Sequence, residues 1–315
     1  MAFQTISLFT GNANLPLANA ISKSTSIKLG AITTRRFSDG EIFVQIEENI
    51  RGSQAFVIQS TCPPVNDNLM ELLIIIDAMK RASVESITAV MPYYGYARQD
   101  RKVAPRTPIS AKLVADLLQS AGVDRVVAFD LHAGQIQGFF DVPFDNLYGS
   151  DVLVDHIRTR LGDKVTVVSP DAGGVERARA YSKRLGASLA IIDKRRERAN
   201  ESEVINIIGS VDGTDCVIVD DMVDTAGTLT NCAKSLLDAG ANKVIAAASH
   251  GVLSGPAISR LKESKIEELV VTDTIPVSEE KKKEARITVV SCAALLGEAI
   301  KRIHTGDSVS GLFKE

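Results

Sequence analysis

The chain has 315 residues, of which 45% are hydrophobic, and its formal net charge is −3. This length suits two domains of about 150 residues, and the nearly balanced charge argues against a nucleic-acid partner. Because the N-terminus lacks a signal-peptide pattern and no run approaches the roughly 18 apolar residues of a membrane span, we expect a cytoplasmic protein without a membrane partner. The cysteines lack the spacing of a zinc or redox site, at Cys62, Cys216, Cys232 and Cys292.

Short apolar runs typical of buried strands alternate with helical patterns along the whole chain. The predicted strands cover residues 7–9, 55–59, 87–90, 125–129, 165–168, 216–219, 243–248, 269–271 and 287–290. The predicted helices cover residues 67–81, 109–120, 174–185, 229–238 and 293–303. In the first of these helices Asp67 or Asn68 is the expected N-cap. The alternation predicts parallel sheets with helices on both faces.

Two of the predicted strands indicate a weak internal repeat, because each ends beside an aspartate at a comparable place in its half of the chain. Asp130 ends the strand at 125–129, and Asp220 follows the strand at 216–219. We therefore expect two similar α/β domains, with residues 1–149 in the first and residues 150–315 in the second.

Residues 216–228 carry the most specific pattern in the chain. Four apolar residues predict a buried strand, and Asp220 and Asp221 follow it, where the hydroxyls of a sugar or a metal ion would bind. A helix N-terminus after a turn of small residues offers unpaired N–H groups and a positive dipole end to a phosphate. The segment therefore predicts a site for a phosphorylated sugar, although capping alone also explains such a turn. The turn reads Asp224, Thr225, Ala226, Gly227 and Thr228.

The turn at residues 36–41 carries side chains suited to a nucleotide. Phe37 can stack on a base, and Asp39 or Glu41 can accept hydrogen bonds from an amine or a sugar hydroxyl. A simple hairpin turn is the alternative interpretation.

A basic loop follows the predicted strand at 87–90. Arg98, Arg101 and Lys102 lie there beside three tyrosines, and guanidinium and ammonium groups bind polyphosphates. The alternative is a solvated basic surface.

Three further candidates follow predicted strands. His132 lies just beyond Asp130, in a position suited to a metal ligand or an acid–base group, although a lone histidine is often structural. Asp171 follows the strand at 165–168 and precedes two glycines, so it can face a ligand. A dense cationic loop suits the charge neutralisation of phosphoryl transfer, with a solvated face as the alternative. This loop holds Lys194, Arg195, Arg196 and Arg198.

Taken together, these segments resemble the ribose-phosphate diphosphokinases, also called phosphoribosyl-pyrophosphate synthetases. The resemblance runs from residues 9–12 to 307–311 and is most specific at 37–41, 95–100, 130–140, 193–196 and 219–228. A simple phosphoribosyltransferase would match only the last of these. The resemblance implies an α/β fold of two similar phosphoribosyltransferase-type domains, each a parallel sheet flanked by helices. The first would carry the ATP-binding segments and the second the ribose 5-phosphate site.

The family transfers the β,γ-diphosphoryl group of ATP to the 1-hydroxyl of ribose 5-phosphate, giving 5-phosphoribosyl 1-diphosphate and AMP for nucleotide biosynthesis. The resemblance implies that a neighbouring subunit holds the adenine. It implies that His132, directly or through water, and Asp171 bind Mg²⁺, and that Lys194 and Arg196 are catalytic. The implied ATP-binding residues are Phe37, Asp39, Gly40, Glu41, Arg98, Gln99 and Asp100. Those implied for ribose 5-phosphate are Arg196, Asp220, Asp221, Asp224, Thr225, Ala226, Gly227 and Thr228.

Two other features bear on the resemblance. Many relatives carry glycine where this chain has Ala226, so we expect an ordinary backbone with negative φ at this position. The phosphate-activated class I of the family also implies an allosteric phosphate site near Ser308 and Ser310, between the subunits of a homo-hexamer. A frayed polar tail is the alternative interpretation of these two serines.

A catalytically silent regulatory paralogue, which binds active synthetase subunits, is the rival function. Such a protein would be expected to lose or interrupt the segments around His132, Asp171 or Lys194. All three are intact in this chain, so the sequence favours the enzyme.

Overall fold

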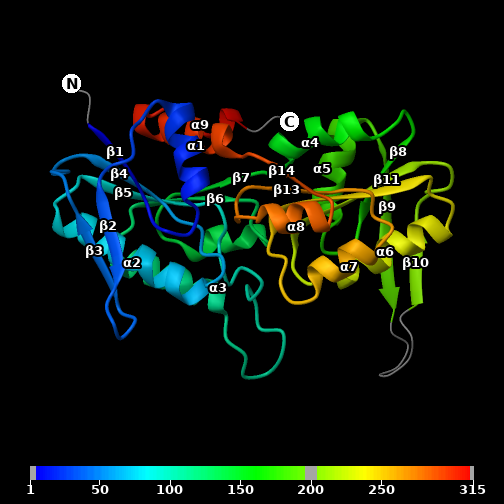
Figure 1. Cartoon of the computed structure of the whole chain (residues 1–315), viewed down its shortest axis with the longest axis horizontal. Helices are drawn as coiled ribbons and strands as arrows, with labels where there is room; N and C mark the ends of the chain where they lie inside the picture. Colours follow the sequence, from blue (N-terminus) through cyan, green and yellow to red (C-terminus); the bar gives the residue numbers. More distant parts are fainter. Residues whose placement is uncertain (1–4, 196–203, 313–315) are drawn as a thin grey trace. The chain divides into compact units, whose positions relative to one another are not determined.

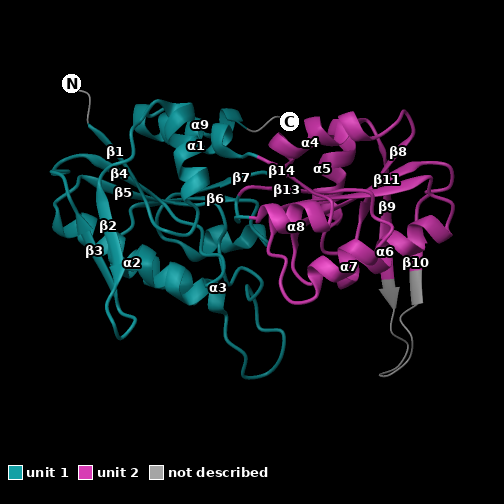
Figure 2. Cartoon of the chain, in the orientation of Figure 1, with its two compact units in different colours: residues 1–148, 274–276, 291–315 teal, residues 149–273, 277–290 magenta. Residues whose placement is uncertain are grey.

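The computed structural model describes residues 5–195 and 204–312, shown in Figure 1. The chain forms two compact units, coloured separately in Figure 2. Unit 1 consists of Met1–Tyr148, Thr274–Pro276 and Ser291–Glu315, and unit 2 of Gly149–Asp273 and Val277–Val290. The first boundary lies next to the predicted one. The C-terminal part differs from the predicted division, because residues from Ser291 onward belong to unit 1.

Unit 1 is built on a five-stranded sheet in the order β1-β4-β5-β6-β7, and every neighbouring pair is parallel. Its central strands are almost wholly buried, as parallel strands covered on both faces require. The strands are β1 (Ile6–Thr10), β4 (Gln54–Ile58), β5 (Ser86–Met91), β6 (Arg125–Phe129) and β7 (Phe144–Leu147).

Helices cover both faces of this sheet, with α1 and α9 on one side and α2 and α3 on the other (Figure 1). The packing of α9 on α1 explains why the C-terminal residues join unit 1. A Cβ atom at Gly297 would lie 2.6 Å from Ser24 Oγ, so glycine is needed where these two helices meet. The bounds are α1 (Leu15–Thr25), α2 (Val65–Arg81), α3 (Ser110–Ala121), α9 (Ala293–Thr305), and the 3₁₀ helices η1 (Gly134–Phe139) and η2 (Ser310–Leu312).

Unit 2 is built on a seven-stranded sheet in the order β10-β9-β8-β11-β12-β13-β14, in which only the edge pair β10–β9 is antiparallel. In β11, Cys216 and Ile218 pack into one apolar cluster, while Val217 and Val219 pack into another on the opposite face. The strands are β8 (Val165–Ser169), β9 (Ser188–Arg195), β10 (Val204–Ile208), β11 (Asp215–Val223), β12 (Lys243–Gly251), β13 (Leu269–Thr272) and β14 (Ile287–Val290).

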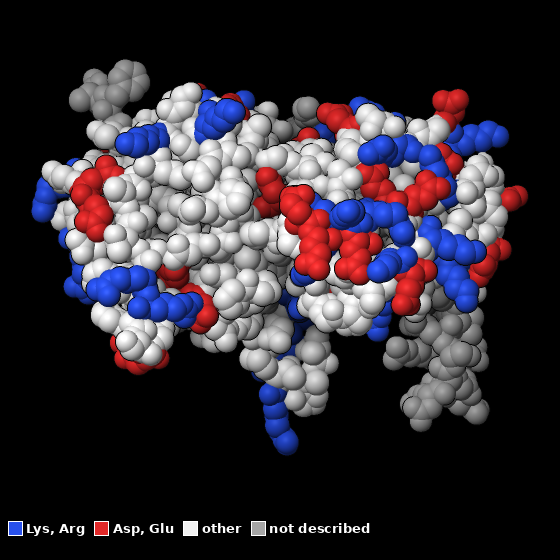
Figure 3. All heavy atoms as spheres, in the orientation of Figure 1, with Lys and Arg blue, Asp and Glu red and all other residues white. Residues whose placement is uncertain are grey.

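Helices α4 and α5 pack on one face of this sheet and α6 and α7 on the other. On the face drawn in Figure 3, basic and acidic side chains are intermixed around α8, where Lys282 pairs with Glu279 at 2.7 Å and Lys262 with Glu284 at 3.0 Å. The bounds are α4 (Ser150–Arg160), α5 (Val175–Leu185), α6 (Gly227–Asp238), α7 (Ala257–Glu263) and α8 (Glu279–Glu284). Within the described ranges, no helix is long and apolar enough to cross a membrane.

All nine predicted strands and five predicted helices lie within observed elements or overlap them. The expected cap of α2 was wrong, because this helix begins at Val65, and its N-cap Pro64 makes no side-chain capping bond. No strand was predicted for β7, β9 or β10. The hairpin of β2 (Ile32–Arg36) and β3 (Ile42–Ile46) was predicted only as the alternative interpretation of the turn at residues 36–41.

Candidate functional site

In unit 2, the turn at residues 224–228 leads from β11 into α6. The helix begins at Gly227, and none of the described side chains caps its N-terminus. Its first backbone N–H groups therefore lack partners within the helix. The side chains of Thr225 and Thr228 are exposed beside them. This arrangement is suited to binding a phosphate.

The backbone at Ala226 differs from the prediction. Its φ of 59° and ψ of 4° lie in the left-handed region, so the expectation of a negative φ was wrong. The chain must turn sharply here to enter α6, and this conformation costs an alanine roughly 1–2 kcal/mol. The methyl group is buried with Leu229 in the apolar cluster, which compensates part of that cost.

Two contacts from later parts of unit 2 hold this turn. The Ser254 hydroxyl donates to an oxygen of the Asp224 carboxylate, and the Ser254 N–H donates to the Asp224 carbonyl at 3.0 Å. Arg260 of α7 donates to the Thr225 carbonyl at 3.0 Å. The Asp224 carboxylate thus orders the turn, while the N–H groups and hydroxyls that follow it are the groups suited to a phosphate.

Asp220 and Asp221 lie within β11, which continues past the predicted end to Val223 because it pairs with β12 as far as Gly251. Asp221 is only 3% exposed. Nη1 of Arg177, on α5, lies 3.8 Å from Asp220 Oδ1 and 3.6 Å from Asp221 Oδ1. Arg177 was not predicted from the sequence; it lies three residues after the Gly173-Gly174 pair that follows Asp171. Arg177 could have been predicted from its position, because it lies in the first turn of α5, the helix that follows β8 and Asp171.

The environment of Asp220 favours its protonated form. Burial, followed by the charge of Asp221 and a hydrogen bond with it, raises the pKa of Asp220 well above the usual value for aspartate. Arg177 and the Asp221 N–H, which donates to Asp220 Oδ1 at 2.8 Å, act in the opposite direction. A carboxyl whose pKa is raised by burial and by a neighbouring carboxyl is typical of functional sites.

Asp171 follows β8, the strand that pairs in parallel with β11. Its exposed carboxylate accepts from Gly174 N–H at 3.0 Å, and its carbonyl accepts from Ser169 Oγ at 2.7 Å. Because carboxyl ends of neighbouring parallel strands share one edge of a sheet, Asp171 lies at the same edge as Asp220 and the 224–228 turn.

The predicted catalytic pair consists of Lys194 and Arg196. Lys194 lies in β9, which pairs in parallel with β8 and ends at Arg195. Arg196 lies outside the described residues.

In unit 1, the loop after β5 holds Arg98, Gln99 and Asp100. Gln99 is fixed at the start of α3, because the Ser110 hydroxyl donates to its Oε1 and the Ala111 N–H donates to its carbonyl at 3.2 Å. Asp100 Oδ2 accepts from Gln135 Nε2 at 2.6 Å. The Arg98 side chain is exposed.

His132 follows β6, the next strand of the sheet, and its side chain is exposed. The preceding residues are held by β7, because Asp130 N–H donates to the Leu147 carbonyl at 2.7 Å and Leu131 N–H donates to Asn146 Oδ1 at 3.1 Å. Through Gln135 and Asp100, the His132 loop is connected to the Arg98 loop. Unit 1 therefore brings these predicted residues together at the carboxyl edge of its own sheet, and Gln135 is a residue that the sequence did not single out.

Residues 37–41 form the turn of the β2–β3 hairpin, a two-stranded sheet of its own. Phe37 is 44% exposed and meets Phe43 edge to face at 5.8 Å, with the Arg35 guanidinium 5.3 Å from the Phe37 ring centre. The turn is closed by bonds from Gly40 N–H to the Phe37 carbonyl and from Glu41 N–H to Asp39 Oδ1. It is both a hairpin turn and a surface that presents an aromatic ring beside two exposed carboxylates.

The C-terminal segment around Ser308 and Ser310 is held on α9. Nη1 of Arg302 donates to the Ser308 carbonyl at 2.8 Å, and Asp307 N–H donates to the Arg302 carbonyl at 2.8 Å. Val309 is buried between the two exposed serines. The described part of this segment is therefore an ordered turn.

The chain matches two family models. Residues 6–122 match the N-terminal domain of ribose phosphate pyrophosphokinase, and residues 195–314 match the phosphoribosyl synthetase-associated domain. A ribose-phosphate pyrophosphokinase of Caldanaerobacter subterraneus is 59% identical over 310 residues, which cover 98% of each chain. One of Agrobacterium fabrum is 57% identical over 307 residues, covering 97% of this chain and 99% of the relative.

A crystal structure of phosphoribosylpyrophosphate synthetase from Mycobacterium smegmatis is similar over 96% of this chain and all of that one, with a TM-score of 0.91 and 45% identity. This likeness confirms the predicted fold class of two α/β domains with parallel sheets flanked by helices. Given identities above 50% over nearly the full length of several relatives, the chain belongs to the ribose-phosphate pyrophosphokinase family of enzymes.

Proposed function

We propose that this enzyme transfers the β,γ-diphosphoryl group of ATP to the 1-hydroxyl of ribose 5-phosphate, producing 5-phosphoribosyl 1-diphosphate and AMP for cytoplasmic nucleotide biosynthesis. The observation that carries the proposal is the turn at 224–228, where an uncapped helix N-terminus follows Asp220 and the buried Asp221 of β11. Such a turn suits a sugar phosphate, and the relatives carry the name of this activity.

The groups at the edge of unit 2 suit the ribose 5-phosphate. The N–H groups and hydroxyls of residues 225–228 bind the 5-phosphate, while Asp220 and Asp221 bind the ribose hydroxyls. Carboxyl oxygens accept hydrogen bonds from hydroxyls, so the adjacent Asp220 and Asp221 suit a pair of ribose hydroxyls. We assign this site to the C-terminal domain and the ATP-binding segments to the N-terminal domain.

The groups of unit 1 suit ATP. Arg98, Gln99 and Asp100 contact the nucleotide. Phe37 stacks on the adenine of a neighbouring subunit, with Gly40 in the turn and Asp39 and Glu41 beside it, in a homo-hexamer. Lys194 and Arg196 neutralise the charge of the transferring group, since phosphoryl-type transfer depends on positioning and electrostatics more than on covalent chemistry.

We propose Mg²⁺ as the cofactor, held by His132, directly or through water, and by Asp171. Among the described residues, no group of three or more His, Cys, Asp or Glu side chains is placed to hold a metal. Such a sparse donor set fits Mg²⁺, which keeps several waters and uses substrate phosphates as ligands. When bound, the ion would supply charge neutralisation on the phosphate oxygens.

We further infer a regulatory phosphate site at Ser308 and Ser310. The ordered turn on α9, with both serines exposed, supports this assignment.

The test is the formation of AMP from ATP and Mg²⁺ by the purified protein, with and without ribose 5-phosphate, beside a Lys194→Ala variant. We expect AMP only in the presence of the sugar, and its loss in the variant. Folded protein that gives no sugar-dependent AMP, even with inorganic phosphate added as activator, would instead indicate the regulatory paralogue.

A further inference from the structure

The two faces of the β2–β3 hairpin have different environments. Cross-strand partners share a face, so Ile32 and Ile46, Thr34 and Val44, and Arg36 and Ile42 point the same way. The apolar residues Ile32, Val44 and Ile46 pack against the core of unit 1. The opposite face carries Arg35 and Phe43, with the Arg35 guanidinium 4.5 Å from the centre of the Phe43 ring. One face of the hairpin is thus packed on the core of unit 1, while the opposite face carries Arg35 and Phe43.

A two-stranded hairpin is marginally stable by itself, so its orientation depends on how this attached face is held. Two polar residues on that face, Thr34 and Arg36, lie between the apolar base of the hairpin and its tip at residues 37–41. Each makes a contact with another part of unit 1.

Thr34 ends a chain of hydrogen bonds that begins in α2. Glu71 is 6% exposed, and its carboxylate accepts from Asn12 N–H at 2.6 Å and from Asn12 Nδ2 at 2.9 Å. The same Nδ2 donates to Thr34 Oγ1 at 2.6 Å. Because an amide nitrogen has only two hydrogens, Glu71 and Thr34 together use both donors of Asn12. The strand β2 is therefore connected through Asn12 to a buried carboxylate.

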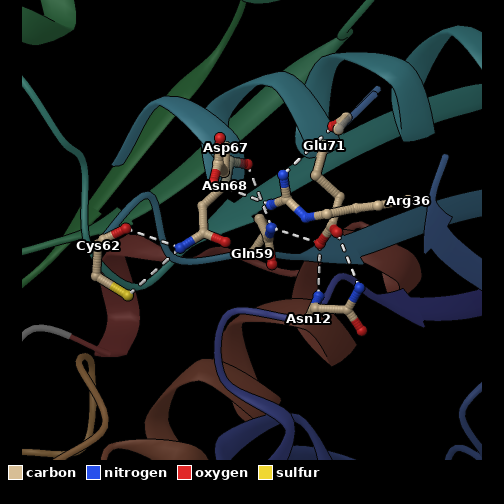
Figure 4. A network of polar contacts seen from close by, with 8 residues as sticks. Asn12, Arg36, Gln59, Cys62, Asp67, Asn68 and Glu71 are labelled. Atoms are coloured by element: carbon tan, nitrogen blue, oxygen red, sulfur yellow. Dashed lines mark hydrogen bonds and ion pairs between the residues drawn. The ribbon is translucent and has the colours of Figure 1, made fainter. Parts of the chain in front are cut away.

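The surroundings of Glu71 make this a rigid anchor. Figure 4 shows Asn12, Gln59 and Glu71 converging between the end of β1 and α2, where Gln59 Nε2 donates to Glu71 Oε1 at 2.9 Å. Gln59 Oε1 in turn accepts from Ala13 N–H at 3.2 Å. A Cβ atom at Gly11 would lie 2.4 Å from Gln59 Oε1, so glycine leaves the space that the network occupies.

Arg36 provides a second connection, next to the tip. Its Nη2 lies 3.0 Å from Asp67 Oδ2 in the first turn of α2, a pair also drawn in Figure 4. The two side chains are 49% and 44% exposed, so the pair adds little to stability. Its effect is on position, because Arg36 directly precedes Phe37.

We propose that Thr34 and Arg36 are positioning residues for ATP: they fix the hairpin to Asn12 and α2, and so hold Phe37, Asp39 and Glu41 in the orientation that receives the adenine. The inference rests on the proposed function of the tip. Neither residue touches the nucleotide in this arrangement, and both act through the orientation of the strand. Loss of either contact weakens ATP binding and leaves ribose 5-phosphate binding unchanged.

Thr34→Val tests the first contact, since it removes one hydroxyl and keeps the shape. Thr33→Val is its matched control, because it makes the same change on the opposite face of the same strand. Arg36→Gln tests the second contact, with Arg81→Gln as the control on α2. We expect Thr34→Val and Arg36→Gln to raise KM for ATP about three- to fivefold, the size of one modest polar contact, with Tm and KM for ribose 5-phosphate unchanged. Backbone amides of residues 32–46 should also exchange faster in Thr34→Val, and not in Thr33→Val.

Phe37→Ala separates this proposal from the one on which it rests. If Phe37→Ala raises KM for ATP while Thr34→Val and Arg36→Gln do not, the tip binds ATP and the positioning role is wrong. If Phe37→Ala itself leaves KM for ATP unchanged, the tip does not bind the nucleotide, and both proposals fall. An equal rise in the Thr33→Val and Thr34→Val variants would also overturn the positioning role.

Discussion

Removal of the Arg177 guanidinium is expected to destabilise unit 2 in a way that depends on pH. Nη1 of Arg177 lies 3.8 Å from Asp220 Oδ1 and 3.6 Å from Asp221 Oδ1, and Asp221 is buried. At an effective dielectric constant of about 20, each such charge pair is worth roughly 4 kcal/mol of attraction. Proton uptake by Asp220 limits the loss, so we expect Arg177→Met to lower the free energy of unfolding by about 3 kcal/mol near neutral pH.

The free energy of unfolding can be measured by urea unfolding. Far-UV circular dichroism is the suitable signal, because the chain has no tryptophan whose fluorescence could be followed. The deficit of Arg177→Met should shrink as the pH is lowered toward the ordinary aspartate pKa of about 3.9, because the carboxyls then take up protons. Adding Asp220→Asn to Arg177→Met should restore about half of the loss, since it removes one of the two repelling charges. A loss that is independent of pH and unaffected by Asp220→Asn would refute the electrostatic explanation.

Three further predictions concern single groups. The raised pKa of Asp220 means that the folded state holds a proton more tightly than the unfolded state. The free energy of unfolding therefore falls as the pH rises from the ordinary aspartate pKa to the raised one. Asp220→Asn should abolish this fall, which the midpoint of urea unfolding, measured at a series of pH values, would show. A Cβ atom at residue 227 would lie 3.0 Å from Arg260 Nη1. Because this is too close, Gly227→Ala should displace Arg260 from the Thr225 carbonyl. We expect KM for ribose 5-phosphate to rise about threefold, with little change in Tm. Burial raises the pKa of Cys62 to about 11, so mass spectrometry should find this thiol unmodified by iodoacetamide at pH 8 in the folded protein and alkylated in urea.

The parts of the fold that the sequence predicted are those in which burial is continuous along the chain. The apolar runs at 125–129 and 216–219 are buried on both faces, and a strand of that kind leaves an unbroken pattern. The hairpin strand Ile32–Arg36 is only partly buried, and β7 (Phe144–Leu147) mixes polar with apolar residues. Their positions depend on partners far along the chain, which a local pattern does not contain.

The residues of the candidate site also divide into those that a local sequence pattern predicts and those that depend on packing between distant elements. Asp171 and Asp220 were singled out because each follows an apolar run, and the structure places both at one edge of the sheet since parallel strands bring their carboxyl ends together. Arg177 was missed because its role depends on how α5 packs against β11. The prediction for Ala226 was wrong because it treated the backbone as a local choice, whereas the crossing from β11 into α6 imposes the left-handed conformation.

Three features of unit 2 that oppose stability fall within eight residues. Asp220 carries a carboxyl next to another carboxyl, Ala226 has a left-handed backbone, and α6 begins without a side-chain cap among the described residues. Each is explained if the segment binds a ligand, since a hydroxyl-binding pair, a sharp turn and free N–H groups are what a sugar phosphate requires. The apolar clusters on both faces of β11 offset this cost, because they hold the strand from Cys216 to Val219 and again at Val223. The unfavourable features therefore lie in the last part of β11 and in the turn that follows it, because only a strand fixed by its core can hold an unfavourable turn in one conformation.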